Sequence, residues 1–232
     1  RKPFPENVKN FLEIFNGGLH GPVIQEHERH YKVDAHNKWV ELLNKDDFRS
    51  LLNEENWEEL TKRIKSCYTI NLISTFEAIK FADAMKHDEA QQAISKGLFE
   101  LLYGTEAIQK HFLDYASVLA KYECDKWPLV TLPLYLRFPE KYMFVKPTVT
   151  QEAAANRGFD IQYSSQVNWN TYQHVLLFSD DLKQRLDAYG NPALAIRDMI
   201  DVQNFMWCSF TGGWSADGVK RAELELRHNK DH

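Results

Sequence analysis

Cysteine is scarce in this sequence, and its few positions exclude two structural roles. The 232 residues include three cysteines, Cys67, Cys124 and Cys208, which lie far apart and never form a C-x-x-C pair. An odd number of distant cysteines predicts neither a disulfide framework nor a thiolate zinc site. We therefore expect reduced cysteines in the core.

A long apolar run is also missing. The longest weakly polar stretch, from Trp127 to Leu136, is about half of the roughly 20 residues that a membrane-spanning helix needs. The N-terminal stretch carries Glu6, Asn7 and Lys9 where a secretory signal would be apolar. These absences predict a cytoplasmic protein without a membrane partner.

A surplus of positive charge is lacking as well. Lysine and arginine total 28 against 33 aspartates and glutamates, which leaves a formal net charge of −5. Such a balance argues against nucleic-acid binding by bulk attraction, although a local basic groove stays open. With 44% hydrophobic and 26% charged residues, the composition is that of a globular protein.

No repeat, low-complexity tract or Ser/Gly linker divides the chain, so we predict a single domain over residues 1–232. The fold class is mainly α, or α+β, with a helical part over 1–125, a β element over 127–147 and C-terminal helices over 148–211. Apolar periodicity and helix-end signals, including a capping box at Ser74 and Glu77 and a stop at Gly104, support the helical part. Its helices are expected near 6–15, 25–43, 46–52, 55–68, 75–86, 88–103 and 105–122.

The predicted β element is a small hairpin around residues 128–146. The stretches "WPLVTLPLYLRF" and "KYMFVKPTV" are rich in β-branched and aromatic residues, and Pro139-Glu140 separates them. Pro128 and Pro133 would confine the first strand to an edge or a bulge. Thr148 with Gln151 predicts a capping box for the next helix.

Four charged or polar side chains fall inside the apolar arc of the helix expected over 25–43: Glu28, Arg29, Lys32 and His36. Glu28, Lys32 and His36 are spaced four residues apart and can share one row. They either form a buried ion network that fixes helix packing or line a cleft for an anionic substrate.

Histidines near this row also raise the question of a metal. "HERH" is one residue short of the H-E-x-x-H arrangement, and His27 and His30 share the polar face with no evident third ligand. We therefore predict no metal site.

A second polar row lies in "RDMIDVQNFMWC", residues 197–208. A helical projection places Arg197, Asp201 and Asn204 on one stripe of an otherwise apolar helix. The stripe either faces solvent or a polar cavity. Arg197 and Asp201 can pair at i,i+4, and an ionised carboxylate beside a donor suits orienting a water or stabilising a developing cation.

A third set of candidates follows the predicted hairpin. Lys146 ends an apolar run and is either solvated, a phosphate contact or an amine nucleophile. Tyr163 and Trp169, in "YSSQVNWNTY", are aromatic residues that could stack on a base or belong to the core.

Several of these stretches together resemble a widespread family of stand-alone bacterial proteins, over most of the chain. The chain looks like the small bacterial antiphage DNA glycosylases that remove glucosylated cytosines from phage DNA. It departs from other glycosylases in lacking the L-P-G-[IV]-G hairpin and the G-Q-D-P-Y and H-P-S-P motifs, so no catalytic motif is carried over. The stretches that carry the resemblance are "GGLHGP", "EHERHYKVDAH", "NLISTFEAIKFADA", "MFVKPTVTQEAAANRGFD", "YSSQVNWNTY" and "RDMIDVQNFMWC".

The resemblance implies base flipping from double-stranded DNA and carboxylate-assisted cleavage of the N-glycosidic bond. It implies no metal or organic cofactor and no obligatory protein partner. From the projections, Asp201 is the first choice for the carboxylate and Glu28 the second, with Lys146 as the amine if a Schiff base forms. The predicted substrate-binding residues are Arg29, Lys32, His36, Arg197, Asn204, Tyr163 and Trp169.

Two other functional classes remain open on the sequence. A metal-dependent nuclease or hydrolase would need Glu28, Asp160, Asp201 or the histidines to converge on an ion. A non-catalytic helical binding module would use all of these charges as structural salt bridges.

Overall fold

The computed structural model describes residues 2–232, and that part of the chain is built from helices joined by turns and coil. The prediction of a mainly α protein is confirmed. The predicted hairpin around residues 128–146 is wrong, because no β-strand occurs in the described residues. None of the helices in residues 2–232 is both long enough and apolar enough to cross a membrane.

A π-helical turn, Gln25–Arg29, joins α2 to α3, and two short 3₁₀ helices span Gly18–His20 and Pro192–Leu194. The first eight α-helices are α1 (Phe4–Ile14), α2 (Pro22–Ile24), α3 (His30–Leu42), α4 (Lys45–Asn53), α5 (Trp57–Tyr68), α6 (Thr75–Ala84), α7 (Asp88–Tyr103) and α8 (Ile108–Ala120). The remaining ones are α9 (Trp127–Arg137), α10 (Pro147–Arg157), α11 (Trp169–Asp187), α12 (Met199–Phe210) and α13 (Ala216–Lys230).

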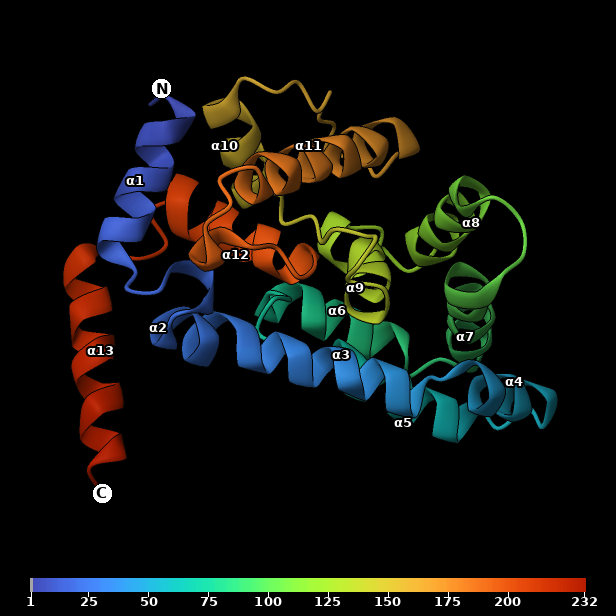
Figure 1. Ribbon diagram of the computed structural model, residues 1–232. Helices are drawn as coiled ribbons and strands as arrows, with labels where there is room; N and C mark the ends of the chain where they lie inside the picture. The colour runs from blue at the N-terminus through green and yellow to red at the C-terminus, as the bar shows by residue number, and fades with distance from the viewer. Residues whose placement is uncertain (1) are drawn as a thin grey trace.

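Helix α9 lies at the centre of the molecule, above α3 in the view of Figure 1. It packs against α3, α7 and α8, and every residue from Trp127 to Leu136 is buried. Helix α12 packs against α1, α10 and α11 near the N-terminus, whereas α4, α5, α7 and α8 form the other end. The buried apolar side chains join these two ends in one cluster.

Helix α9 occupies the segment for which the sequence predicts a β-strand. A short run that is apolar on every side does not reveal its period, so strand and helix look alike. Pro128 stands in the first turn, where no backbone donor is needed. Pro133 leaves the Leu129 carbonyl without its helical donor, and the Tyr68 hydroxyl donates to that carbonyl at 2.8 Å instead. A tertiary contact thus compensates for the internal proline.

The second predicted strand is an extended segment without a β partner. Met143 and Val145 are buried. The Val145 amide donates to the Thr131 hydroxyl at 2.9 Å, and the Met143 carbonyl accepts from the Tyr172 hydroxyl at 2.8 Å. Side chains therefore satisfy backbone groups that a sheet would otherwise have paired. The segment ends at Lys146, the N-cap of α10.

Helix ends match most of the sequence signals. The capping box of Ser74 and Glu77 is confirmed, and Gly104 caps the end of α7. Gly158 ends α10 with a φ of 65°, in the left-handed region that glycine tolerates best. The capping box at Thr148 is wrong, because Pro147 already starts α10 and the N-cap is Lys146, two residues before Thr148.

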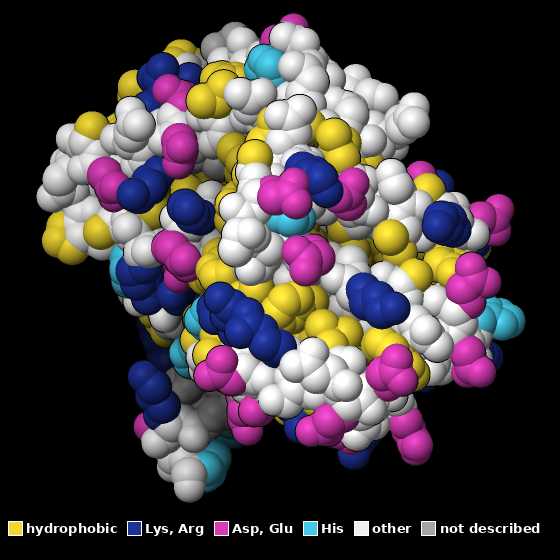
Figure 2. All heavy atoms as spheres, turned by 90° about the vertical axis from the view of Figure 1, so that its right-hand side faces the viewer, with side chains coloured by type: hydrophobic (Ala, Val, Ile, Leu, Met, Phe, Trp, Pro, Cys, Tyr) yellow, Lys and Arg dark blue, Asp and Glu magenta, His cyan; other side chains and the backbone are white. Residues whose placement is uncertain are grey.

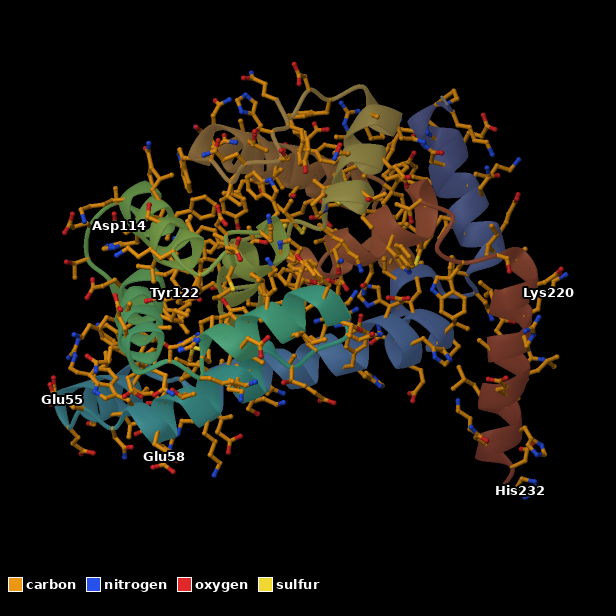
Figure 3. All side chains as sticks on the ribbon, turned by 180° about the vertical axis from the view of Figure 1, so that it is seen from behind. Glu55, Glu58, Asp114, Tyr122, Lys220 and His232 are labelled. Atoms are coloured by element: carbon orange, nitrogen blue, oxygen red, sulfur yellow. The ribbon has the colours of Figure 1, made fainter. Side chains whose placement is uncertain are left out.

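Helix α13 lies beyond the last predicted helix, which ends at residue 211. The Ser215 hydroxyl caps its first turn by accepting from the Gly218 amide at 3.0 Å. Only Val219 and Ala222 are buried, against α2, and the rest of the helix projects from the body (Figure 3).

The opposite end of the molecule has a mixed surface charge. Acidic and basic side chains alternate over the face shown in Figure 2. Lys110 on α8 illustrates this pattern, because its amine lies 3.7 Å from Glu106 and 2.8 Å from Asp114. This face therefore offers no surface of one sign to a charged partner.

Candidate active site

The π-helical turn Gln25–Arg29 turns two neighbouring charged residues inward. Glu28 and Arg29 are each 9% exposed, although adjacent residues of a regular α-helix point about 100° apart. A π-turn holds an extra residue in one turn, and such turns are common at functional sites. The sequence predicts one regular helix over 25–43, so this local widening is not visible from the periodicity.

The two polar rows predicted from the sequence face one another. Lys32 donates to Asn204 at 2.6 Å, and Arg29 donates to Asp201 at 2.9 Å. Asp201 and Asn204 are both 0% exposed, so the stripe on α12 does not face solvent.

Asp201 is the centre of a buried ion network. Its Oδ1 accepts from Arg29 Nη1 and from Arg197 Nη2, each at 2.9 Å. Its Oδ2 accepts from Arg197 Nε at 2.9 Å and from the Arg197 backbone amide at 2.8 Å. Both carboxylate oxygens are therefore fully occupied by protein donors, which leaves Asp201 without a free oxygen for a substrate or a water.

Asp198 completes this network at the start of α12. It forms a bidentate pair with Arg29 at 2.9 and 2.8 Å and caps the helix by accepting from the Asp201 amide at 3.2 Å. Burial alone would lower the pKa of Arg29, but Asp198 and Asp201 outweigh burial and raise it. The guanidinium therefore stays charged and ties the π-turn to α12.

Lys32 and Glu28 form a second buried pair, next to this network. The Lys32 amine is 3.5 Å from Glu28 Oε2, and Trp214 Nε1 donates to Glu28 Oε1 at 2.8 Å. Burial lowers the pKa of Lys32 to about 8, partly offset by the charge of Glu28, and Lys146 adds a small repulsion. The amine is thus poised to lose or give a proton near neutral pH.

The Glu28–Lys32 pair lines a polar pocket of about 180 Å³, hereafter the Glu28 pocket. Side chains from the π-turn, α3, α10, α12 and the loop before α6 form its wall. They are His27, Glu28, Tyr31, Lys32, Asn71, Leu72, Lys146, Val149, Gln203 and Trp207. The pocket wall thus contains an acid, two amines, neutral polar groups and apolar side chains.

Gln203 is a buried polar residue of this pocket that the predicted site residues do not include. It is 5% exposed, and its Oε1 accepts from the Tyr135 hydroxyl at 3.1 Å. Its Nε2 donates to no group of the described chain, so a donor is available in the pocket wall. The signal in the sequence was a glutamine in an apolar helix, but the helical projection placed it away from the polar stripe.

The remaining predicted site residues lie apart from the pocket wall. His36 contacts the Leu136 carbonyl through its ring, and Arg197 is held by Asp201. Trp169 packs edge-on against Phe112, within the aromatic core. Tyr163 also packs against the core and does not line the pocket.

The histidines do not gather with other ligands. His30 pairs with Glu26 at 3.3 Å, His20 contacts the Ala195 carbonyl at 2.7 Å, and the His27 ring lies against Trp214. Within residues 2–232 no three His, Cys, Asp or Glu side chains are placed to hold a metal ion together. All three cysteines are free, and Cys208 is partly exposed.

A pH dependence of stability follows from the buried Lys32. Its pKa, about 8, lies below the ordinary 10.5, so between these pH values the unfolded chain binds a proton that the folded chain does not. Burial of this charge lowers the unfolding free energy by its full amount below pH 8, and this loss disappears as the pH rises to 10.5.

We expect the free energy of unfolding of the wild type to rise relative to Lys32→Met by on the order of 3 kcal/mol over this range. Urea unfolding of both proteins at several pH values measures the difference between their unfolding free energies. Groups that titrate alike in both proteins do not contribute to this difference. A difference that does not change with pH would contradict the burial of a titrating Lys32.

Comparisons of the chain with models of protein families, with curated proteins and with solved structures found no match. No residue role is therefore transferred from another protein, and the functional assignment rests on the geometry of the Glu28 pocket.

Proposed function

We propose that the protein is a DNA glycosylase that removes a modified cytosine from double-stranded DNA, with the flipped base held in the Glu28 pocket. The observation that carries the proposal is the buried acid–amine pair of Glu28 and Lys32 in the wall of a small polar pocket. The pocket, about 180 Å³, is smaller than the roughly 300–1,000 Å³ of sites for drug-sized ligands. That size suits a single ring better than a whole nucleotide.

Hydrogen-bonding groups in the wall support a cytosine-like ring. The free Nε2 of Gln203 is a donor for a ring nitrogen or carbonyl of the base. Lys146 is exposed and lies at the N-cap of α10, where its amine can contact a phosphate of the DNA backbone.

The proposed chemistry uses the two members of the pair in different roles. The bond between C1′ of the sugar and the base nitrogen breaks, and the electron pair leaves with the base, which takes a proton from Lys32. The Glu28 carboxylate stabilises the positive charge that develops on the sugar and accepts a proton from the water that adds to C1′. Asp201 supports this site indirectly, because its oxygens already hold Arg29 and Arg197.

The direct test is incubation of the purified protein with duplexes that contain cytosine, hydroxymethylcytosine or glucosylated hydroxymethylcytosine, followed by alkaline cleavage at abasic sites. We expect cleavage of a modified duplex after alkali, in the presence of a chelator. No cleavage on any duplex would refute the proposal. Strand breaks that form without alkali and stop on chelation would instead identify a metal-dependent nuclease.

A further prediction concerns the pH profile of excision. Because Lys32 must be protonated to act as the acid and its pKa is about 8, we expect the single-turnover rate to fall as the pH rises above 8. Lys32→Arg places a cation of much higher pKa at this position. Any excision rate that the variant retains should therefore not fall as the pH rises above 8. A wild-type rate that is flat from pH 7 to 10 would exclude Lys32 as the acid.

A further inference from the structure

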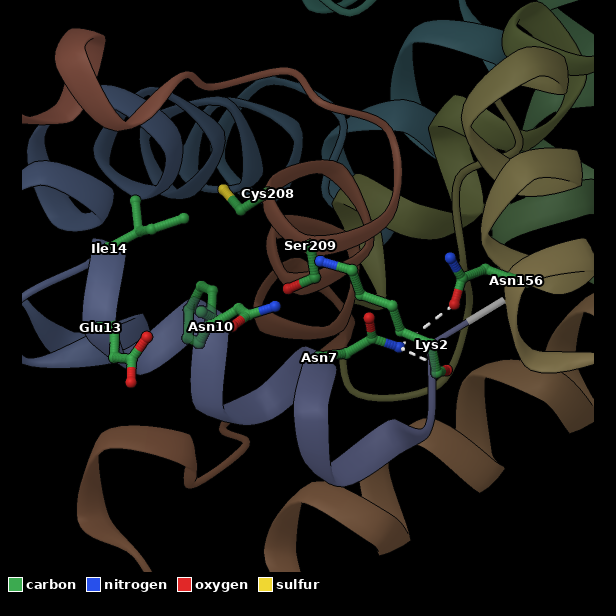
Figure 4. A pocket seen from close by; sticks show the side chains of 9 residues that line it. Lys2, Asn7, Asn10, Glu13, Ile14, Asn156, Cys208 and Ser209 are labelled. Atoms are coloured by element: carbon green, nitrogen blue, oxygen red, sulfur yellow. Dashed lines mark hydrogen bonds between the residues drawn. The ribbon is translucent and has the colours of Figure 1, made fainter.

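A second pocket, separate from the Glu28 pocket, lies between α1, the end of α10 and the end of α12 (Figure 4). Its volume is about 440 Å³, within the roughly 300–1,000 Å³ of small-molecule sites. The two pockets share no lining residue. The polar side chains of the second pocket, hereafter the asparagine pocket, are Lys2, Asn7, Asn10, Glu13, Asn156 and Ser209.

One buried side chain in this wall has an oxygen without a hydrogen-bond partner. Asn7 is 5% exposed, and its Nδ2 donates to Asn156 Oδ1 at 3.2 Å and to the Lys2 carbonyl at 3.5 Å. No group of the described chain donates to Asn7 Oδ1, which points into the pocket in Figure 4. Polar groups of buried side chains are rarely left unpaired, so the Asn7 oxygen is an acceptor available to a ligand in the pocket.

The wall chemistry restricts the class of that ligand. Three carboxamides and a hydroxyl are neutral, and together they offer both donors and acceptors. Lys2 and Glu13 carry opposite charges, so the pocket has no net charge to attract an ion. Phe11 and Ile14 add an apolar patch.

We propose that the asparagine pocket binds a neutral polyhydroxylated ligand of the size of a hexose. Each sugar hydroxyl both donates and accepts, which matches a wall that presents both kinds of group, and the C–H face of a sugar ring suits the apolar patch. A phosphate or carboxylate ligand would meet the Glu13 carboxylate and would leave the amide oxygens without donors. This inference does not depend on the DNA glycosylase activity.

The test is a titration of the full chain with D-glucose and D-galactose, with inorganic phosphate as the charged comparison. We expect saturable shifts of the side-chain amide signals of Asn7, Asn10 and Asn156 in two-dimensional NMR spectra with at least one hexose. Asn10 is only partly buried, so Asn10→Leu should keep the fold and weaken the binding by about tenfold, the loss of one hydrogen-bonding group.

The matched control is Asn53→Leu, an exposed residue at the end of α4, which should bind like the wild type. The proposal is overturned if neither hexose gives saturable shifts up to about 100 mM, a hundredfold above a millimolar dissociation constant. It is equally overturned if phosphate binds more tightly than both hexoses, or if Asn10→Leu and Asn53→Leu weaken the binding alike.

Discussion

The Glu28→Gln variant is expected to excise modified cytosine about 10²- to 10⁴-fold more slowly than the wild type. Glutamine has nearly the same shape and can still accept from Trp214 Nε1, which donates to Glu28 at 2.8 Å. The substitution therefore removes the negative charge while it keeps the local packing. Without that charge, the site neither stabilises the sugar cation nor accepts the proton of the attacking water.

Single-turnover excision under saturating enzyme measures this loss without a contribution from product release. Glu26→Gln is the matched control, because Glu26 belongs to the same π-helical turn but is exposed, and its partner is His30. The control should excise at the wild-type rate and melt near the wild-type temperature. Glu28→Gln should melt lower, because it breaks the buried pair with Lys32, so the rates are compared at a temperature at which both variants are folded. Retention of most of the activity by Glu28→Gln would remove Glu28 from the mechanism, whatever the activity of the other variants.

The Asp201→Asn variant is expected to lose about 3–5 kcal/mol of unfolding free energy, the effect of breaking a buried ion pair. Asp201 is fully buried, and its two oxygens accept four hydrogen bonds from Arg29 and Arg197. An asparagine offers one oxygen and places an amide donor against the guanidinium groups. It therefore leaves positive charge uncompensated in a region of low dielectric constant.

Urea unfolding measures this change, and Asp181→Asn provides the comparison on the surface. Asp181 also binds an arginine, Arg185, at 2.8 Å, but both side chains are exposed. That variant should change the unfolding free energy by about 1 kcal/mol or less. A loss below 1 kcal/mol for Asp201→Asn would contradict the structural role of the network.

Most of the helical elements could be predicted because their signals are local. The capping box of Ser74 and Glu77 and the stop at Gly104 depend on a few neighbouring residues, and both occur as predicted. The strand prediction over α9 failed because that helix is buried on all sides and carries Pro133, a residue that usually excludes a helix interior. The hydrogen bond that replaces the one lost at Pro133 comes from Tyr68, on a distant helix, so the sequence around Pro133 does not reveal it.

The candidate site was predictable only in part, because spacing within one helix is also a local signal. Spacing placed Glu28 and Lys32 on one row and Asp201 and Asn204 on another, but it did not distinguish a free carboxylate from an occupied one. Arg29 and Asp201 are 172 residues apart, and only the packing of α12 against the π-turn brings them within 2.9 Å. That contact occupies Asp201, so of the two candidate carboxylates only Glu28 lines a pocket.

By itself, the sequence determined the helical class, most helix positions and the polar residues of the two rows, because these follow from the composition and from spacings within single helices. The tertiary structure alone decided that the rows face each other, that Gln203 joins the Glu28 pocket and that Lys32 is buried with a pKa near 8. Burial and hydrogen-bond partners depend on side chains that are remote in the chain, so they exist only once the helices have packed.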